Sequence, residues 1–312
     1  MKKPTPPLRF ASLSDAHRAL GLPGPPHPLI SLLSGAHLPA DGAGLHQAHV
    51  LSFYKIAYRP RLGNPLCYGQ GHYDFAEGGL LFAAPEQLIG GGPDTAEAEA
   101  AGCGHYTLLV HPDFLAGYPL ARKIRRYGFF SYAAHEALHV SEKEKTQLLG
   151  LFQILQEELA DRLDEFSQDV VVAQLELLLT YANRFYKRQF LTRKAAHGPL
   201  LQRLEELLDE CFAADKLPEQ GIPTVQWLAE RLHVSAGYLS DLLRTLTGLS
   251  AQQHIHHRLI EQAKTRLAGT ARSVSEIAYE LGFEHSQSFS KLFKAKTSTT
   301  PLTYRRSFAA SA

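Results

Sequence analysis

The segment LAERLHVSAGYLSDLLRTLTG (residues 228–248) returns later in the chain as IAYELGFEHSQSFSKLFKAKTS (residues 277–298). The first parts of the two segments align at an offset of 49 residues and the last parts at 50, so the second copy has one extra residue in its turn. Each copy predicts a short helix, a tight turn and a second helix. Ala229 and Ala278 are small where two helices must approach closely, and Ser235 is placed to cap the second helix of the first copy. The repeat therefore predicts two helix-turn-helix units, whose second helices are of the kind that enters the major groove of DNA.

A single helix is predicted between the two units. Ile255, Leu259, Ala263 and Leu267 recur every four residues within residues 250–269, which is a helical spacing. About 18 helical residues at ~1.5 Å each extend roughly 27 Å. One turn of DNA measures about 34 Å, so two units held by such a helix are spaced to read consecutive faces of the major groove.

Charge is distributed unevenly along the chain. The formal net charge is +1, but residues 222–312 contain eleven Lys and Arg against six Asp and Glu, a net of +5, which leaves −4 for the rest. A basic segment beside a mildly acidic one indicates a polyanionic partner for the basic part. A chance bias of surface charge explains this distribution equally well.

Short sequence phrases run through the two copies, the segment between them and the residues that follow. In order they are Leu228-Ala229-Glu230, Tyr238-Leu239-Ser240, Thr247-Gly248-Leu249-Ser250, Arg258 to Lys264, Val274-Ser275-Glu276-Ile277-Ala278, Gly282-Phe283, Phe289 to Lys294, Pro301 and Tyr304-Arg305. At this order and spacing, residues 224–306 resemble the AraC/XylS family of regulators across the whole double unit. The resemblance implies a transcriptional regulator that binds promoter DNA and contacts RNA polymerase.

The chain departs from the family pattern around the second copy. Ser298 replaces a usual glycine, Thr297 replaces a usual hydrophobic residue, and Ser288 stands where an aromatic residue is common. These departures predict a looser turn after the second recognition helix. We still expect this copy to fold, because apolar residues remain at positions 277, 281, 289, 292 and 293.

The resemblance also implies which side chains contact DNA. The expected base-facing positions and the adjoining turn are Ser235, Ala236, Gly237, Ser240 and Asp241 in the first copy, and His285, Gln287, Ser288 and Lys291 in the second. Gln287 and Lys291 are the strongest candidates, because glutamine pairs bidentately with adenine and lysine donates to guanine. Arg244, Lys294, Lys296 and Arg305 are better placed for phosphate contacts, which give affinity and register without sequence information. Solvated surface charge is the alternative for each of them.

The sequence before the repeat predicts a β-rich part and then helices. Residues 1–44, rich in Pro, Gly and Ala, are expected to form a flexible arm and loops with a short helix at 14–20. Strands are expected at 50–58, 80–83 and 106–111, and their Gly and Pro turns are typical of a small sandwich or barrel. Helices are expected at 142–163 and 168–190, with a capping box at Ser141 and Glu144. Gly198-Pro199 is expected to break the chain before a helix at 200–212.

Short motifs in residues 47–140 resemble the cupin-like jelly roll that many AraC-type regulators have as a sensor. They are Tyr68-Gly69, Tyr73-Asp74-Phe75, Glu77 to Phe82, Pro85 and His111 to Leu115. The predicted fold is therefore α+β and multidomain. Its parts are an arm (1–44), a cupin-like sensor (45–140), a helical dimerisation segment (141–197), a helix with a connector (198–223) and the double helix-turn-helix domain (224–312).

A barrel mouth is a natural pocket for a small effector. By residue type and location, its candidate lining is Tyr54, Tyr58, Tyr68, His72 and Tyr73, with a role as core aromatics as the alternative. A barrel that serves only as a scaffold, without a ligand, stays open. The rival function is a cupin enzyme, which needs His-x-His with a downstream Glu and a further His. His46 and His49 are three residues apart and His72 stands alone, so we expect no metal, no cofactor and no enzymatic activity.

The family resemblance implies a homodimer formed by the two helices that follow the barrel. Leu148, Leu151, Leu155 and Leu159 form one apolar edge that suits such an interface, although packing within the domain explains the edge equally well. The three cysteines, Cys67, Cys103 and Cys211, are far apart, which favours a reducing cytoplasm over a disulfide framework. Prolines follow Met1-Lys2-Lys3 at once and no long apolar run occurs, so we expect a cytoplasmic protein without a signal peptide or membrane span.

Overall fold

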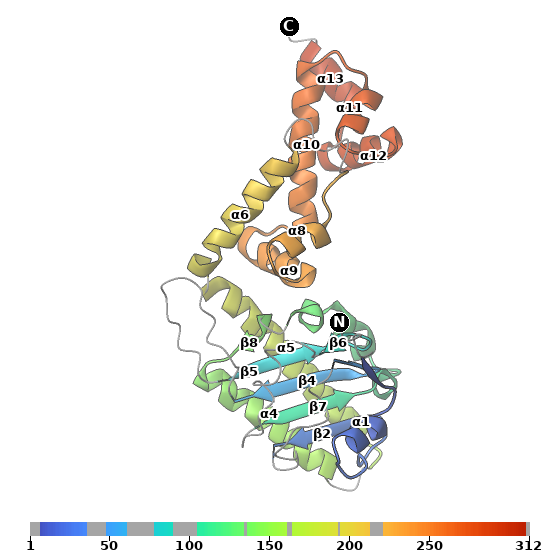
Figure 1. Ribbon diagram of the computed structural model, residues 1–312, viewed down its shortest axis with the longest axis vertical. Coiled ribbons are helices and arrows are strands. Elements are labelled where there is room, and N and C mark those ends of the chain that lie inside the picture. Colours follow the sequence, from blue (N-terminus) through green and yellow to red (C-terminus); the bar gives the residue numbers. More distant parts are fainter. Residues whose placement is uncertain are drawn as a thin grey trace, which may run out of the picture. The chain divides into compact units, whose positions relative to one another are not determined.

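The computed structural model describes residues 7–35, 48–60, 78–89, 105–133, 136–160, 164–192, 194–212 and 221–309. The chain divides into two compact units, residues 1–192 and 193–312 (Figure 1). The first unit combines β-sheets with helices, and the second is helical in its described part. This organisation agrees with the predicted α+β multidomain class. Among the described residues, no helix combines the length and the apolar character needed to cross a membrane.

Five described strands of the first unit form an antiparallel sheet. Their order is β2 (Ile30–Ser34), β7 (Tyr106–Val110), β4 (Tyr54–Arg59), β5 (Gly79–Ala83) and β8 (Leu138–His139). A smaller sheet contains β1 (Leu8–Phe10), β3 (His49–Leu51) and β6 (Leu88–Ile89), and β1 pairs with β3 in parallel. Two sheets fit the expected β-rich first part, whereas the jelly-roll topology stays a prediction.

The single strand predicted at residues 50–58 is wrong, because the chain changes sheets within it. β3 ends at Leu51 in the small sheet, and β4 begins at Tyr54 in the large one. Between them, the Ser52 N–H donates to the Phe10 carbonyl at 3.0 Å, and the Phe53 side chain is fully buried. The run is largely apolar because both halves contribute buried side chains to the core.

Residues 8–34 are more structured than an arm. The predicted short helix is present as α1 (Leu13–Ala19), capped by Ser12, whose side chain accepts from the Asp15 N–H. On either side of it lie β1 and β2, two strands too short to give a periodic signal. Phe10, Leu13 and Ala16 are buried in a cluster with Leu33 and Leu109, which fixes this segment to the large sheet.

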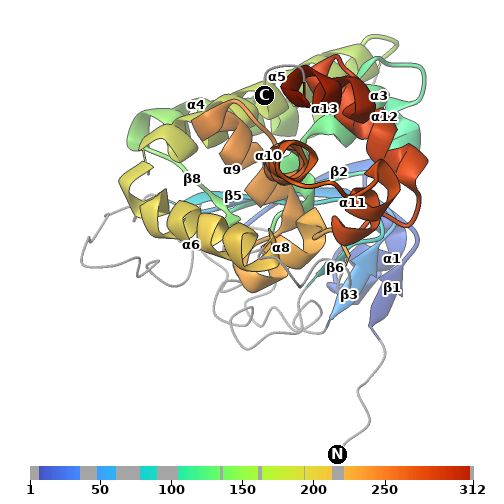
Figure 2. The same ribbon diagram turned by 90° about the horizontal axis from the view of Figure 1, so that it is seen from above.

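Two long helices cover the opposite face of the large sheet. They are α4 (Glu142–Ala160) and α5 (Ser167–Thr192), and Figure 2 shows them on the side of the sheet away from β1 and β3. The predicted capping box of α4 is confirmed, because the Ser141 N–H donates to Glu144 and the Glu144 N–H donates to the Ser141 Oγ. Phe152 of α4 stacks on Tyr106, and Tyr186 of α5 lies 6.3 Å from Phe82 between ring centres.

The apolar edge proposed for dimerisation lies inside this unit. Leu148, Leu151, Leu155 and Leu159 are each 6% exposed or less. The edge therefore packs within the unit, and an interface between two chains needs other residues. Short helical segments complete the unit: η1 (Pro112–Leu115), α3 (Leu120–Lys123), η2 (Ile124–Arg126) and η3 (Gly128–Ser131).

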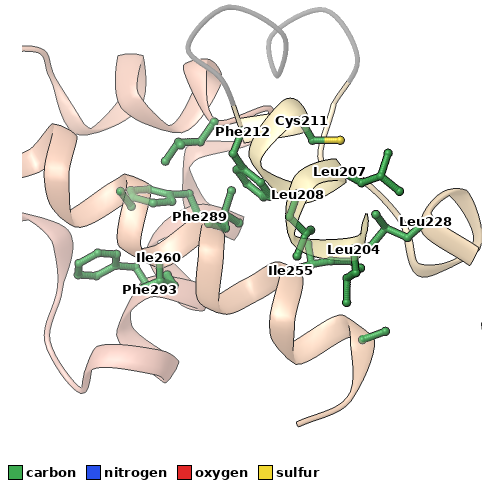
Figure 3. Close-up of a cluster of buried hydrophobic side chains, with 14 of the residues drawn as sticks. Leu204, Leu207, Leu208, Cys211, Phe212, Leu228, Ile255, Ile260, Phe289 and Phe293 are labelled. Atoms are coloured by element: carbon green, nitrogen blue, oxygen red, sulfur yellow. The ribbon is translucent and has the colours of Figure 1, made fainter. Parts of the chain in front are cut away.

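The second unit is built around one apolar core. Its described helices are α6 (Lys194–Phe212), α8 (Val225–Arg231), α9 (Ala236–Thr247), α10 (Ala251–Gly269), α11 (Val274–Glu280), α12 (Ser286–Thr297) and α13 (Pro301–Ala309). Figure 3 shows Leu204, Leu208 and Phe212 of α6 beside Ile255 of α10 and Leu228 of α8. α6 thus belongs to the same core as the two helix-turn-helix units.

The predicted break at Gly198-Pro199 is wrong, because α6 starts at Lys194 and continues through Pro199. Proline lacks a backbone N–H, but its fixed φ angle suits a helix and the cost is least near the start. Pro199 is the sixth residue of α6, and the later part of the helix is held by Leu204, Leu207 and Leu208, which are at most 2% exposed.

Candidate nucleic-acid interface

The two helix-turn-helix units have the same turn geometry. The Val234 N–H donates to the Ala229 carbonyl, and the Phe283 N–H donates to the Ala278 carbonyl, both at 3.0 Å. Ala229 and Ala278 are fully buried, which confirms that both alanines lie at close helix contacts. The residue before each donor has a positive φ angle: 56° at His233 and 81° at Gly282.

Both recognition helices end in the same type of cap. Gly248 ends α9 at φ 80°, and its N–H donates to the Arg244 carbonyl at 3.0 Å. Ser298 ends α12 at φ 61°, and its N–H donates to the Lys294 carbonyl at 2.8 Å. The predicted looser turn after α12 is wrong, because Ser298 keeps the hydrogen bond that glycine makes in the first copy. Serine adopts this left-handed conformation at a conformational cost that glycine avoids.

The linker helix α10 separates the two helix-turn-helix copies. Its predicted buried stripe is confirmed, since Ile255, Leu259, Ala263 and Leu267 are at most 1% exposed. Its start is fixed by a capping box between Ser250 and Gln253. The 19 residues of α10 span about 28 Å at ~1.5 Å each. Figure 1 shows α8 and α9 beside one end of α10, and α11 and α12 beside the other.

The candidate base-reading side chains of the second copy are exposed on one face of α12 and its cap. They are His285, Gln287, Ser288 and Lys291, and Lys294 lies one turn further along. α12 also contains Lys296 and has no acidic residue, so its formal charge is +3. Within the described residues, Lys291, Lys294 and Lys296 have no ion-pair partner. This face presents two kinds of group: an amide, a group that can bond base edges, and ammonium groups, which can bond phosphates.

The corresponding face of α9 is smaller and neutral. The Ser235 side chain accepts from the Tyr238 N–H, which confirms the predicted cap. Ala236, Gly237 and Ser240 are half-buried. Asp241 and Arg244, the two charged residues of α9, form an ion pair at 2.7 Å. This pair was missed in the sequence, although acid and base three residues apart on a helix are neighbours.

Arg305 lies in a structural contact rather than on a free surface. Its Nε donates to the Leu267 carbonyl at 3.2 Å, in the last turn of α10, and the side chain is partly buried. A cation that donates to a terminal carbonyl stabilises the end of a helix. This geometry favours Arg305 as a link between α13 and α10.

Two further side-chain contacts lie in or beside the first copy. The Arg231 guanidinium lies 4.2 Å from the ring centre of Trp227, one turn earlier on α8. On α10, the His254 ring bonds the Thr247 hydroxyl at 2.8 Å, which joins the end of α9 to the start of α10. Burial lowers the pKa of His254, so this contact involves the neutral ring at pH 7.

Of the five candidate effector residues, the structure describes two. Tyr54 and Tyr58 are buried core residues, and Tyr54 packs edge-on against Phe130 at 5.1 Å between ring centres. Burial raises the pKa of both phenols. Tyr68, His72 and Tyr73 lie outside the described residues.

Comparison with known proteins gives the class of this second unit. Residues 228–307 match the family described as a helix-turn-helix domain. The regulatory protein SoxS of Escherichia coli is 32% identical over 110 residues, which are 35% of this chain and 96% of SoxS. The chain therefore belongs to the AraC-type family of helix-turn-helix transcriptional regulators.

Longer relatives match over only part of their length. The uncharacterized HTH-type transcriptional regulator YijO of Escherichia coli is 29% identical over 109 residues, 35% of this chain and 36% of YijO. The transcriptional activator RhaS of Salmonella schwarzengrund is 28% identical over 195 residues, 62% of this chain and 64% of RhaS. The RhaS match is longer than the whole second unit of this chain and therefore reaches into the first.

Proposed function

We propose that this protein regulates transcription by binding promoter DNA in a sequence-specific manner. The observation that supports the proposal is a pair of helix-turn-helix units at the two ends of one 19-residue helix. A helix-turn-helix places its second helix in the major groove. In this arrangement α9 and α12 enter successive faces of the groove, and RNA polymerase is the partner on which the bound regulator acts.

The two recognition helices contribute differently in this proposal. Gln287 and Lys291 read base edges, while Lys294 and Lys296 contact phosphates. On α9, Ser235, Ala236, Gly237 and Ser240 approach the DNA closely through small side chains. Asp241 holds Arg244, and Arg305 acts from α13 by fixing the end of α10. Because phosphate contacts release counterions, the lysines of α12 dominate the salt dependence of binding.

The test is selection of bound sequences from a random DNA duplex pool by the purified full-length protein at one stated salt concentration. We expect a motif of two boxes about one helical turn apart, since α10 separates the two readers by about 28 Å. Binding that is sensitive to salt but blind to sequence would refute sequence-specific regulation by this chain alone. Absence of any binding would refute the proposal altogether.

Regulation by a small effector and formation of a homodimer belong to the same proposal. An effector bound to the first unit acts only if it favours one conformation over another. For the dimer, the exposed apolar side chains Val170 and Leu177 lie seven residues apart on one face of α5, and Phe166 precedes them. Sedimentation of the wild type and of Leu177→Glu tests this interface. A wild-type dimer and a monomeric variant are expected, and an unchanged dimer would exclude this face.

A further inference from the structure

One carboxylate joins three parts of the second helix-turn-helix copy. Glu280 is the last residue of α11, and its Oε2 atom accepts from Nη1 of Arg266 at 3.3 Å. Arg266 lies in the last turn of α10. The other oxygen, Oε1, accepts from Arg272, which stands directly before Ser273, the N-cap of α11. Glu280 therefore connects the end of α10 to both ends of α11.

Two of these three side chains are well covered. The Arg266 side chain is 14% exposed and that of Glu280 is 25% exposed, whereas Arg272 is 58% exposed. Salt screens a partly buried pair less than a surface pair, and a shared carboxylate forms a small network of charges. Removing one partner also leaves the other without its counter-charge. We therefore expect the pair of Glu280 and Arg266 to contribute to the structure.

The apolar core holds this copy against α10 but fixes its rotation less. Leu267 of α10 lies in the same buried cluster as Ile277 and Leu281, and each of them is at most 1% exposed. Hydrophobic contact is non-directional. A charge-assisted hydrogen bond, in contrast, requires its donor and acceptor to be aligned. The bonds of Glu280 thus fix the angle at which α11 packs on α10.

The recognition helix α12 is fixed in turn to α11. The Phe283 N–H donates to the Ala278 carbonyl at 3.0 Å. The Phe283 ring lies edge-on to the buried Phe289 ring of α12, with 5.5 Å between ring centres. An orientation set at the end of α11 therefore passes to the helix that contains Gln287 and Lys291.

The first copy has a different contact at the equivalent position. Arg231 aligns with Glu280 in the repeat, and its guanidinium lies over Trp227 of its own helix. At the other end of α10, the His254 ring bonds the Thr247 hydroxyl at 2.8 Å. Position 280 thus joins two helices in the second copy, whereas its counterpart contacts its own helix in the first.

We propose that Glu280 is a positioning residue that sets the spacing between the two boxes of the DNA target. By holding Arg266 and Arg272, it fixes the direction in which α12 is presented from the end of α10. Each base pair advances the groove by about 3.4 Å and by about one tenth of a turn. A fixed α12 therefore meets the second box at one spacing. The inference rests on the proposed function, because a spacing exists only for DNA that both copies bind.

The test measures the affinity of the full-length protein for duplexes in which the spacer between the two selected boxes is shortened or lengthened by one or two base pairs. We expect the wild type to prefer one spacer by about tenfold or more, because a box out of register loses its base contacts. Glu280→Gln should reduce this preference to about threefold, the scale of one hydrogen-bonded ion pair. Its affinity for a duplex with the first box alone should stay unchanged. Arg266→Gln, which removes the partner on α10, should behave alike and replaces Glu280→Gln if that variant does not fold.

Glu261→Gln is the matched control. Glu261 pairs with Lys264 on α10 itself at 2.8 Å. This variant therefore loses the same charge and one ion pair but leaves the contact of α10 with α11 intact, and it should keep the wild-type preference. An unchanged preference in a folded Glu280→Gln or Arg266→Gln variant, or an equal reduction in Glu261→Gln, would overturn the proposal.

A second measurement needs no DNA and separates this inference from the proposed function. Spin labels at Gln226→Cys on α8 and Ala295→Cys on α12, both exposed positions, report the distribution of distances between the two copies by pulsed electron resonance. The three native cysteines are replaced by alanine in this background. We expect Glu280→Gln to broaden the distribution, and an unchanged width would overturn the positioning role. A wild type that selects no motif but shows the expected broadening would refute the proposed function and not the positioning role of Glu280.

Discussion

Each helix-turn-helix copy contains one glycine and one other residue at its two left-handed positions. Within the turn these are His233 in the first copy and Gly282 in the second. After the recognition helix they are Gly248 in the first copy and Ser298 in the second. The left-handed conformation costs about 1–2 kcal/mol for a residue with a Cβ atom. Each copy therefore keeps the same backbone at the expense of one strained residue.

Replacing the strained serine with glycine is expected to stabilise the second copy. Ser298→Gly should raise the free energy of unfolding by about 1 kcal/mol, since relief of strain exceeds the added freedom of the unfolded chain. Urea unfolding followed by circular dichroism measures the change. Ser298→Ala, which keeps the Cβ atom, serves as the control and should show no gain. A lower stability of the glycine variant would contradict the strain at this position.

Replacement of Gln287 and of Lys294 by alanine is expected to change DNA binding in different ways. Gln287→Ala should alter base preference at one or two positions of the selected motif, because an amide reads a base edge. Lys294→Ala should weaken binding to every sequence alike and reduce the salt slope by about one. Quantitative binding to a panel of single-base variants at several salt concentrations separates the two. A uniform loss in Gln287→Ala would reject its role in reading bases.

The neutral state of His105 predicts acid sensitivity. Burial, with the charges of Arg59 and Lys55, lowers its folded pKa from the ordinary value of about 6.5 to about 4, so the unfolded chain binds the proton first. This contribution to stability is complete above pH 6.5 and is lost as pH falls towards 4. By pH 5 the loss is about 2 kcal/mol. Urea unfolding at pH 7.5 and pH 5 should show that His105→Gln loses less stability than the wild type. Equal losses would mean that another group controls this range.

At the scale of elements, α9 and α12 have the same length but different charge. α12 has three lysines and no acid, whereas the acid and base of α9 form an ion pair. Asp241 aligns with Lys291 in the repeat, and Arg244 aligns with Lys294. One acidic residue therefore pairs with the arginine and leaves the first copy neutral where the second copy has two lysines.

Asp241→Asn is expected to release Arg244 for phosphate contact. Affinity should rise for all DNA sequences, and the salt slope should steepen by about 0.9, the effect of one more neutralised phosphate. Because the gain is blind to sequence, the ratio of specific to non-specific affinity should fall. Salt titrations with the selected motif and with a scrambled duplex measure both quantities.

Glu230→Gln is the matched control for this variant. It adds the same charge to the protein from α8, where Glu230 accepts from Gln226. Its effect on the salt slope should be small. Equal effects of the two variants would show that total charge, rather than the Asp241–Arg244 pair, sets the affinity.

Sequence predicted the elements of the second unit better than those of the first. Helical spacing of apolar residues located α10 and α12, and their turns followed from the repeat. In the first unit a largely apolar run hid the passage from β3 to β4, since strands in two packed sheets look alike in sequence. At Pro199 the sequence predicted a break where α6 is continuous, because the packing of the later part of α6 outweighs the local effect of proline.

The contacts of the candidate site also differ in how far the sequence predicts them. The spacing of Asp241 and Arg244 permits an ion pair on a helix, but both residues were expected to contact DNA and their pairing was missed. The contact of Arg305 with Leu267 joins residues 38 positions apart, and only the packing of α13 on α10 brings them together.

For the whole molecule, the composition of the core of the second unit predicts that this unit folds without the first. Among the residues that the structure describes, the buried members of the cluster around Ile255 all lie between Leu204 and Phe293, within the second unit. Residues 193–312, expressed alone, should therefore unfold cooperatively and bind the selected motif with the salt slope that the full chain shows per protomer. Circular dichroism and salt titration of this fragment are the measurements. A fragment that does not fold would mean that the first unit supplies part of its stability.

The ring of Trp227 has an optical consequence. It is the one tryptophan of the chain, and it lies on α8 beneath Arg231. Fluorescence excited selectively at tryptophan thus reports on the helix-turn-helix unit alone, while the tyrosines of the first unit stay silent. Changes around this helix can therefore be followed by tryptophan emission without any added label.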